Sequence, residues 1–171
     1  MRSAFFTAVS ILLIGWVMWV YTGGDPLRFC NMLNICVVSV SGFSAIRYTI
    51  MGRNQLLGGV LGYWQSVIFS MRFYLYCGLV LTLGVFLFLY FHPDFLAAYF
   101  NAYEVLLKDL KESGQDVSSI SDLIEMSRDS LLAESPLNLA FDSAFSYCFF
   151  GTIASLFYSF FLTKEKKNGK A

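Results

Sequence analysis

The feature that most constrains this chain is a set of four long apolar runs without any Asp, Glu, Lys, Arg or His. They cover approximately residues 4–21, 29–46, 73–91 and 143–162. A helix needs about 20 mostly apolar residues to cross a bilayer, with a range of roughly 17–25. Membrane strands are shorter and alternate apolar with polar side chains. The four runs therefore predict an all-α membrane protein with four transmembrane helices, in one domain that spans residues 1–171.

The overall composition agrees with a membrane location. Of the 171 residues, 57% are hydrophobic and only 14% are charged, whereas an ordinary globular domain carries about 25% charged residues. This composition excludes a disordered chain, a disulfide-rich secreted module and a free nucleic-acid-binding domain. Membrane lipids are therefore expected partners and nucleic acid is not. The first run is longer than the apolar part of a signal peptide, so we expect it to remain as an anchor.

The basic residues are distributed unevenly between the two sides of such a membrane protein. With four spans, both termini and the loop near residues 54–71 share one side. Cytoplasmic loops are enriched in Lys and Arg, so both termini are predicted to be cytoplasmic. Eight of the twelve basic residues fall on this side, and most acidic residues fall on the other. The eight are Arg2, Arg47, Arg53, Arg72, Lys164, Lys166, Lys167 and Lys170.

Residues 54–71 have apolar side chains at helical spacing and allow two interpretations. The segment is either an interfacial helix in the inner headgroup layer or, from about Tyr63, the first half of one long helix that continues to Phe91. Nothing between Trp64 and Phe91 breaks a helix. We favour the long helix, which would follow a glycine turn at Gly58-Gly59.

Residues 92–137 predict an extracytoplasmic helical hairpin between the third and fourth transmembrane helices. Pro93 suits the first position of a helix, and Gly114 suits the end of one. Ser119 is expected to cap the second helix together with Asp122. Ser135-Pro136 is expected to open the fourth transmembrane helix as its cap and first residue. Each helix has an apolar face that packs either on the other helix and the membrane or on a partner. These faces comprise Phe95, Leu96, Tyr99, Tyr103, Leu106, Leu107 and Leu110, and then Ile120, Leu123, Ile124, Leu131 and Leu132.

No set of residues predicts catalysis, a bound cofactor or a metal site. His92 is the single histidine, and its place beside Pro93 is typical of a polar residue at a membrane boundary. Cys30, Cys36, Cys77 and Cys148 form no metal-binding spacing and are expected to pack as small apolar residues. A buried polar pocket would instead favour a lipid-modifying enzyme; its candidate lining residues are Gln65, Ser66, Ser70 and Arg72.

The predicted fourth helix carries small residues at four-residue spacing. Gly151, Ser155 and Ser159 form this face, and Ala144 extends it towards the outer side. Small residues let two helix backbones approach closely in lipid. The face therefore packs inside the four-helix bundle or receives the helix of a partner.

Several motifs along the chain carry a resemblance to a known family. They are the glycine turn with Trp64-Gln65, the boundary motif His92-Pro93-Asp94-Phe95-Leu96, Ser135-Pro136, and Gly151 with Ser155-Leu156 before a lysine-rich tail. On these motifs the chain resembles, over nearly its whole length, an uncharacterised domain-of-unknown-function family of small four-pass bacterial inner-membrane proteins. The resemblance implies an inner-membrane location and an association with glycosyltransferases that act on lipid-linked sugars.

These observations favour a non-catalytic accessory or scaffold subunit, whose membrane partner acts in envelope or lipid-linked glycan biogenesis. The alternative is a small-solute transporter or an oligomeric channel, and a homo-oligomer fits either. Ion-coupled transporters usually carry an ionisable residue inside the bilayer, and the four apolar runs have none. Channels can instead use backbone and hydroxyl groups, so the alternative remains open.

Overall fold

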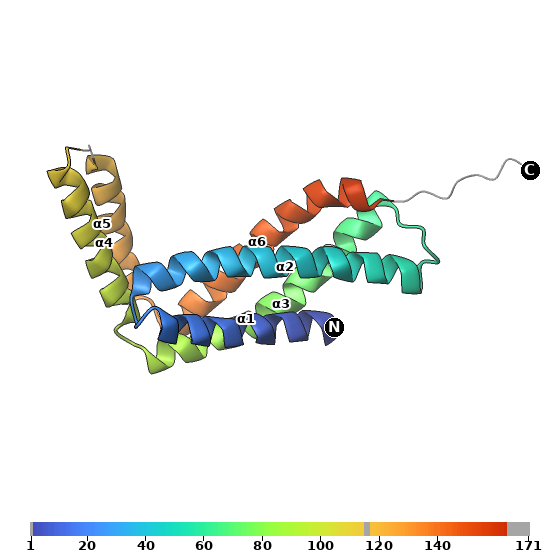
Figure 1. Cartoon of the computed structure of the whole chain (residues 1–171), viewed down its shortest axis with the longest axis horizontal. Coiled ribbons are helices and arrows are strands. Elements are labelled where there is room, and N and C mark those ends of the chain that lie inside the picture. The colour runs from blue at the N-terminus through green and yellow to red at the C-terminus, as the bar shows by residue number, and fades with distance from the viewer. Residues whose placement is uncertain (1, 115–116, 164–171) are drawn as a thin grey trace, which may run out of the picture.

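The computed structural model describes residues 2–114 and 117–163, and these form six α-helices (Figure 1). They are α1 (Arg2–Tyr21), α2 (Pro26–Leu56), α3 (Tyr63–Phe91), α4 (Phe95–Glu112), α5 (Ser118–Ala133) and α6 (Pro136–Leu162). By length and composition, α1, α2, α3 and α6 are able to cross a membrane. The prediction of an all-α chain with four apolar helices of membrane-spanning length is therefore confirmed.

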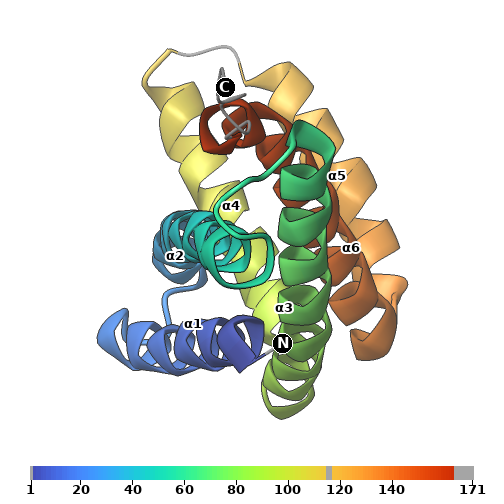
Figure 2. The same ribbon diagram turned by 90° about the vertical axis from the view of Figure 1, so that its right-hand side faces the viewer.

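The four apolar helices form a bundle with α3 at its centre. α6 packs mainly on α3, whereas α1 packs on α2 and α3. Figure 2 looks along the bundle and places α1 and α6 on different sides of α3. The buried core accordingly takes most of its large side chains from α3. It comprises Ala4, Ala8, Ile11, Ala45, Phe73, Tyr74, Cys77 and Leu81.

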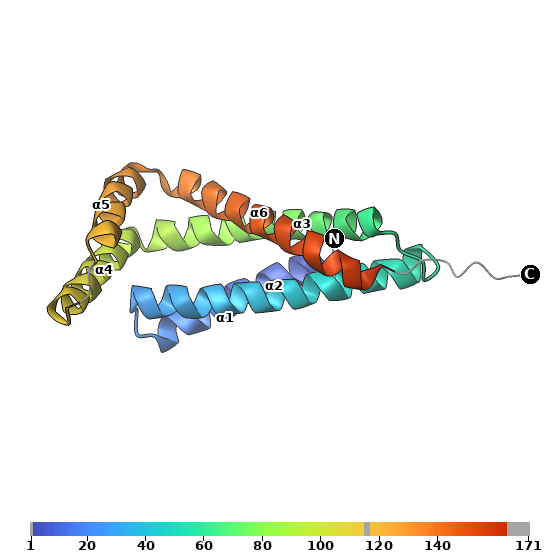
Figure 3. The same cartoon turned by 90° about the horizontal axis from the view of Figure 1, so that it is seen from above.

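α4 and α5 lie side by side at one end of the bundle and are steeply inclined to it (Figure 3). The start of α1, the α2–α3 connection and the end of α6 lie towards the other end (Figure 1). Arg2 begins α1, and Arg47 and Arg53 lie in the last third of α2, which leads into the α2–α3 connection. The four lysines of the C-terminal tail lie outside the described residues.

α2 is longer than the apolar run 29–46 from which it was predicted. At its start, the Asp25 carboxylate accepts hydrogen bonds from the backbone N–H groups of Leu27 (3.0 Å) and Arg28 (3.1 Å). At its end, the helix continues through Arg47 and stops only before Gly58, whose φ of +59° requires the left-handed region. The prediction ended at the first charged residue, but a charged residue does not break a helix. Charge-free runs therefore underestimate helix length.

α3 is one continuous helix that begins at Tyr63, and this corresponds to the favoured interpretation of residues 54–71. The Gln65 side chain accepts a hydrogen bond from the Gly62 backbone N–H (3.2 Å) and so satisfies a donor at the start of the helix. Because α3 is continuous, Arg72 lies inside it rather than in a loop.

Two local details of the predicted hairpin are wrong, and one is confirmed. α4 begins at Phe95 and not at Pro93, because residues 92–94 form a turn in which the Phe95 N–H bonds to the His92 carbonyl (3.1 Å). α5 begins at Ser118 after Val117, so Ser119 lies within the helix and does not cap it. The predicted opening of α6 is confirmed, since the Ser135 hydroxyl accepts a hydrogen bond from the Asn138 N–H (3.3 Å).

Candidate functional site at the α3–α6 interface

The small-residue face of α6 lies inside the bundle. Ser155 and Ser159 are fully buried, Gly151 is buried and Ala144 is half-buried. Most contacts of α6 with the rest of the chain are made to α3. The chain's own α3 therefore covers the face, which is not open to the helix of a partner in this structure.

Two glycines explain how closely α3 and α6 approach. A Cβ added to Gly151 would lie 2.4 Å from Cδ1 of Tyr74, and one added to Gly78 would lie 2.7 Å from Sγ of Cys148. Each helix thus contributes one glycine and inserts a side chain over the glycine of the other. The Cys148 thiol also donates a hydrogen bond to the Tyr74 carbonyl (3.5 Å). Tyr74 has no distinguishing spacing in the sequence, so only the structure reveals its contact with Gly151.

Buried hydroxyl groups occupy the interior next to this contact. The Thr49 and Ser70 hydroxyls lie 2.9 Å apart, and both side chains are fully buried. Each is also placed to donate to its own helix, Thr49 to the Ala45 carbonyl (2.9 Å) and Ser70 to the Ser66 carbonyl (3.0 Å). A hydroxyl has only one proton. Therefore only two of these three hydrogen bonds can form at once.

Further buried hydroxyls make no hydrogen bond within the described residues. They belong to Ser66 and Ser159. An unpaired buried hydroxyl costs about 1–3 kcal/mol, and a bound water would remove that cost. The bundle therefore buries these two hydroxyls without a partner among the described residues.

The polar pocket considered from the sequence is not assembled. Ser66 and Ser70 are buried in the bundle, whereas Gln65 and Arg72 are exposed on other faces of α3. Among residues 2–114 and 117–163, no group of three or more His, Cys, Asp or Glu side chains could hold a metal ion.

The C-terminal half of α6 is tied to the neighbouring helices. The Tyr63 hydroxyl of α3 donates to the Leu156 carbonyl (3.1 Å), and the rings of Tyr63 and Phe160 lie 4.6 Å apart. The Arg53 guanidinium of α2 donates to the Leu162 carbonyl (3.4 Å), one of the last carbonyls of α6. These contacts fix the position of α6 against both α2 and α3.

An aromatic cluster joins the outer end of the bundle to α4. Its members are Trp19, Phe29, Phe88, His92 and Phe95, which come from α1 to α4 and the α3–α4 turn. The Trp19 ring lies 5.4 Å from Phe88, 5.3 Å from His92 and 5.6 Å from Phe95. His92 therefore packs among aromatic rings, which is a structural role.

α5 leaves an apolar face uncovered. We call Ile120, Leu123 and Met126 the α5 apolar face; they are 50%, 64% and 76% exposed. α4 buries Phe100 and Leu107, whereas α5 buries none of its residues Ser118–Ala133. The sequence did not single out Met126 or Phe100.

An ion pair joins α4 and α5. Arg128 of α5 pairs with Glu104 of α4. The contact joins the two helices of the hairpin across their exposed side.

Comparisons with known proteins bear on the family but not on the activity. Searches of curated proteins and of solved structures find no match. A family model described as a protein of unknown function, DUF4199, matches residues 2–164. Because this match covers nearly the whole chain, the chain belongs to the DUF4199 family.

Proposed function

We propose that this chain is a non-catalytic accessory or scaffold subunit of the bacterial inner membrane, and that its α5 apolar face holds a membrane partner. The observation that carries the proposal is the exposure of Ile120, Leu123 and Met126 on a helix outside the four apolar ones. Exposed apolar patches on a folded protein mark sites of interaction with proteins or membranes. The α6 face cannot serve this purpose, because α3 covers it.

The proposed orientation places both termini in the cytoplasm and the α4–α5 pair outside the membrane. It is supported by Arg2 at the start of α1 and by Arg47 and Arg53 in the last third of α2. The start of α1 and the end of α2 lie towards the end of the bundle opposite α4 and α5 (Figure 1). A reporter fused after Gly114 is expected to behave as extracytoplasmic, and one fused after Lys170 as cytoplasmic. Reporters that share one compartment would overturn the orientation.

The proposed partner is an enzyme of envelope or lipid-linked glycan biogenesis, such as a glycosyltransferase. This part of the proposal rests on the family resemblance. The test is purification of the tagged chain from its own membranes in mild detergent. One partner is expected in stoichiometric amount, and its mass spectrum would identify its class.

Matched variants link the partner to α5. Leu123→Lys places a charge in the middle of the α5 apolar face and is expected to remove the partner at unchanged yield of the chain. Ser121→Lys adds the same charge at an exposed position outside that face. This variant is expected to retain the partner. A partner kept by both variants, or no partner with the unaltered chain, would contradict the proposal.

The buried hydroxyls favour one second candidate, a small-solute transporter or oligomeric channel. Ser66 and Ser159 are fully buried without a hydrogen bond in the described part of the chain, and hydroxyls can line a pore. In proteoliposomes, such a protein would pass a small polar solute, and the double variant Ser66→Ala/Ser159→Ala would change the rate. Equal flux with and without protein would exclude this candidate for the solutes tested.

A further inference from the structure

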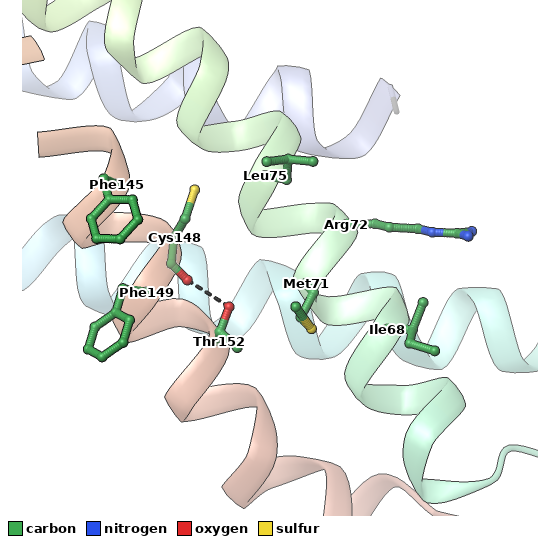
Figure 4. A pocket seen from close by; sticks show the side chains of 8 residues that line it. All are labelled: Ile68, Met71, Arg72, Leu75, Phe145, Cys148, Phe149 and Thr152. Atoms are coloured by element: carbon green, nitrogen blue, oxygen red, sulfur yellow. Dashed lines mark hydrogen bonds between the residues drawn. The ribbon is translucent and has the colours of Figure 1, made fainter. Parts of the chain in front are cut away.

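An apolar groove of about 490 Å³ runs along the outside of the α3–α6 contact (Figure 4). Each helix contributes four residues at the spacing of one helix face. Those of α3 are Ile68, Met71, Arg72 and Leu75, and those of α6 are Phe145, Cys148, Phe149 and Thr152. The groove therefore spans about two turns of each helix, or about 10 Å, and suits a narrow occupant.

The lining offers an occupant almost no hydrogen-bonding group. The Thr152 hydroxyl already donates to the Cys148 carbonyl (2.8 Å), and the Cys148 thiol donates to Tyr74 (3.5 Å). Phe145 and Phe149 are stacked, with ring centroids 6.4 Å apart, and both are exposed. The part of an occupant that lies in the groove must therefore be apolar.

Arg72 is the exception in this lining. Its side chain is exposed, and it forms no hydrogen bond or ion pair with any described residue. Figure 4 shows the guanidinium extending from α3 away from α6, at the rim of the groove. A cation at such a position in a membrane helix normally pairs with an anion. An occupant that matches the lining is therefore apolar, with one anionic group beside Arg72.

The depth of Arg72 fits the headgroup level of a bilayer. Phe91, the last residue of α3, lies 19 residues further along the helix, and this segment spans about 28 Å at 1.5 Å per residue. The hydrocarbon core of a bilayer is about 30 Å thick. With Phe91 at one boundary, the guanidinium thus reaches the other. Leu75 and Phe145 lie on the bilayer side of Arg72, and Ile68 lies one turn beyond it on the headgroup side.

We propose that this groove is a binding site for one anionic phospholipid of the leaflet at the Arg72 end, with an acyl chain along the groove and the phosphate on Arg72. Arginine binds phosphate through several N–H groups in a fixed geometry. The site requires the four apolar helices to lie in a bilayer but does not require a partner protein.

The experiment measures how tightly phosphatidylglycerol and phosphatidylcholine are retained by the purified full chain, using native mass spectrometry with lipid titration. Arg72→Gln is expected to weaken retention of phosphatidylglycerol about tenfold, which corresponds to one charge-assisted hydrogen bond of about 1.4 kcal/mol. Arg47→Gln is the matched control, because Arg47 is an arginine of α2 towards the same end and does not line the groove. It is expected to change retention less than twofold.

A second variant tests the acyl chain and does not alter a charge. Leu75 is 54% exposed, so Leu75→Trp fills the groove without entering the core. Leu75→Trp is expected to weaken retention of phosphatidylglycerol at least fivefold, although Arg72 is still present. Soluble glycerophosphoglycerol, which has the headgroup but no acyl chain, is expected not to compete.

Three results would overturn the lipid site. They are equal losses for Arg72→Gln and Arg47→Gln, equal retention of the two lipids by the unaltered chain, and protection of the groove by a second copy of the chain. Each would leave co-purification of a partner through α5 unaffected. Failure of the lipid site and failure of the proposed function are thus distinguishable.

Discussion

The α3–α6 interface and the α4–α5 pair each consist of two neighbouring helices, but they bury very different side chains. The α3–α6 contact is built from glycines, fully buried serines and a cysteine thiol, and its backbones approach closely. α4 and α5 share the pair between Glu104 and Arg128, and α5 buries no residue of its own. In lipid, close packing and hydrogen bonds hold helices together. In water, burial of apolar surface holds helices together, and α5 buries little apolar surface.

The difference indicates where each pair obtains its stability. The α3–α6 contact is stabilised by the two helices themselves, because Tyr74 of α3 packs on Gly151 and Cys148 of α6 packs on Gly78. The α4–α5 pair depends on the aromatic cluster at its base, where Phe95 packs against Trp19 and Phe29. Burial, followed by a hydrogen bond with the Tyr103 hydroxyl, raises the pKa of Tyr99 on α4, so this phenol stays neutral. Substitutions in the two regions should therefore have effects of different size and extent.

The largest effect is expected from Ser155→Leu. Ser155 is fully buried, so the larger side chain must displace its neighbours at a cost of about 2–3 kcal/mol. Ser130→Leu makes the same change on the exposed surface of α5, and is expected to stay within about 0.5 kcal/mol. The free energy of unfolding in mixed detergent micelles measures both. Equal effects would count against a specifically packed α3–α6 interface.

Two glycine variants test the same contact with a single methyl group. Gly151→Ala places a Cβ against Cγ and Cδ1 of the Tyr74 ring, whereas a Cβ at Gly42 of α2 would meet nothing within 4 Å. Gly151→Ala is expected to cost about 1–3 kcal/mol, and Gly42→Ala is expected to be neutral or slightly stabilising. If Gly151→Ala costs no more stability than Gly42→Ala, then α3 and α6 do not approach each other as closely as in this structure.

An intermediate and local effect is expected from Trp19→Ala. Trp19 contacts four other aromatic rings of the cluster, so its removal should cost about 2 kcal/mol, roughly half the value for a fully buried tryptophan. Hydrogen exchange is expected to accelerate in α4 and α5 but not at the α3–α6 interface. Trp64→Ala is the control, because Trp64 is 68% exposed. Uniform acceleration throughout the chain would contradict a separately anchored α4–α5 pair.

The same contrast between the two regions shows what the sequence could predict. The four apolar helices were predictable, because a charge-free apolar run longer than about 17 residues is typical of a transmembrane helix. Their ends were less so, since α2 continues through Arg47 and Arg53 without a break. The predicted start of α4 at Pro93 and the predicted capping role of Ser119 in α5 were wrong. The start of α4 coincides with the packing of Phe95 in the aromatic cluster, a tertiary contact that has no local signal in the sequence.

The candidate site shows the same limit. Gly151, Ser155 and Ser159 were recognised as a packing face from their spacing, but spacing does not distinguish an internal helix from a partner helix. The answer depends on Tyr74, a residue far away in the sequence that covers Gly151. The groove was not predicted at all, because its lining combines four residues from each of two separate helices.

The smallest effect is expected at the ion pair between Glu104 and Arg128. The two side chains are 51% and 33% exposed, and exposed ion pairs contribute between about 0 and 1 kcal/mol. Glu104→Gln should therefore lower the free energy of unfolding by no more than about 0.5 kcal/mol, and a salt concentration of about 1 M should remove the difference. The exchanged pair Glu104→Arg/Arg128→Glu should restore most of the loss. A loss of several kcal/mol would mean that this pair is the main contact between α4 and α5, and the aromatic cluster would then lose its proposed role as their anchor.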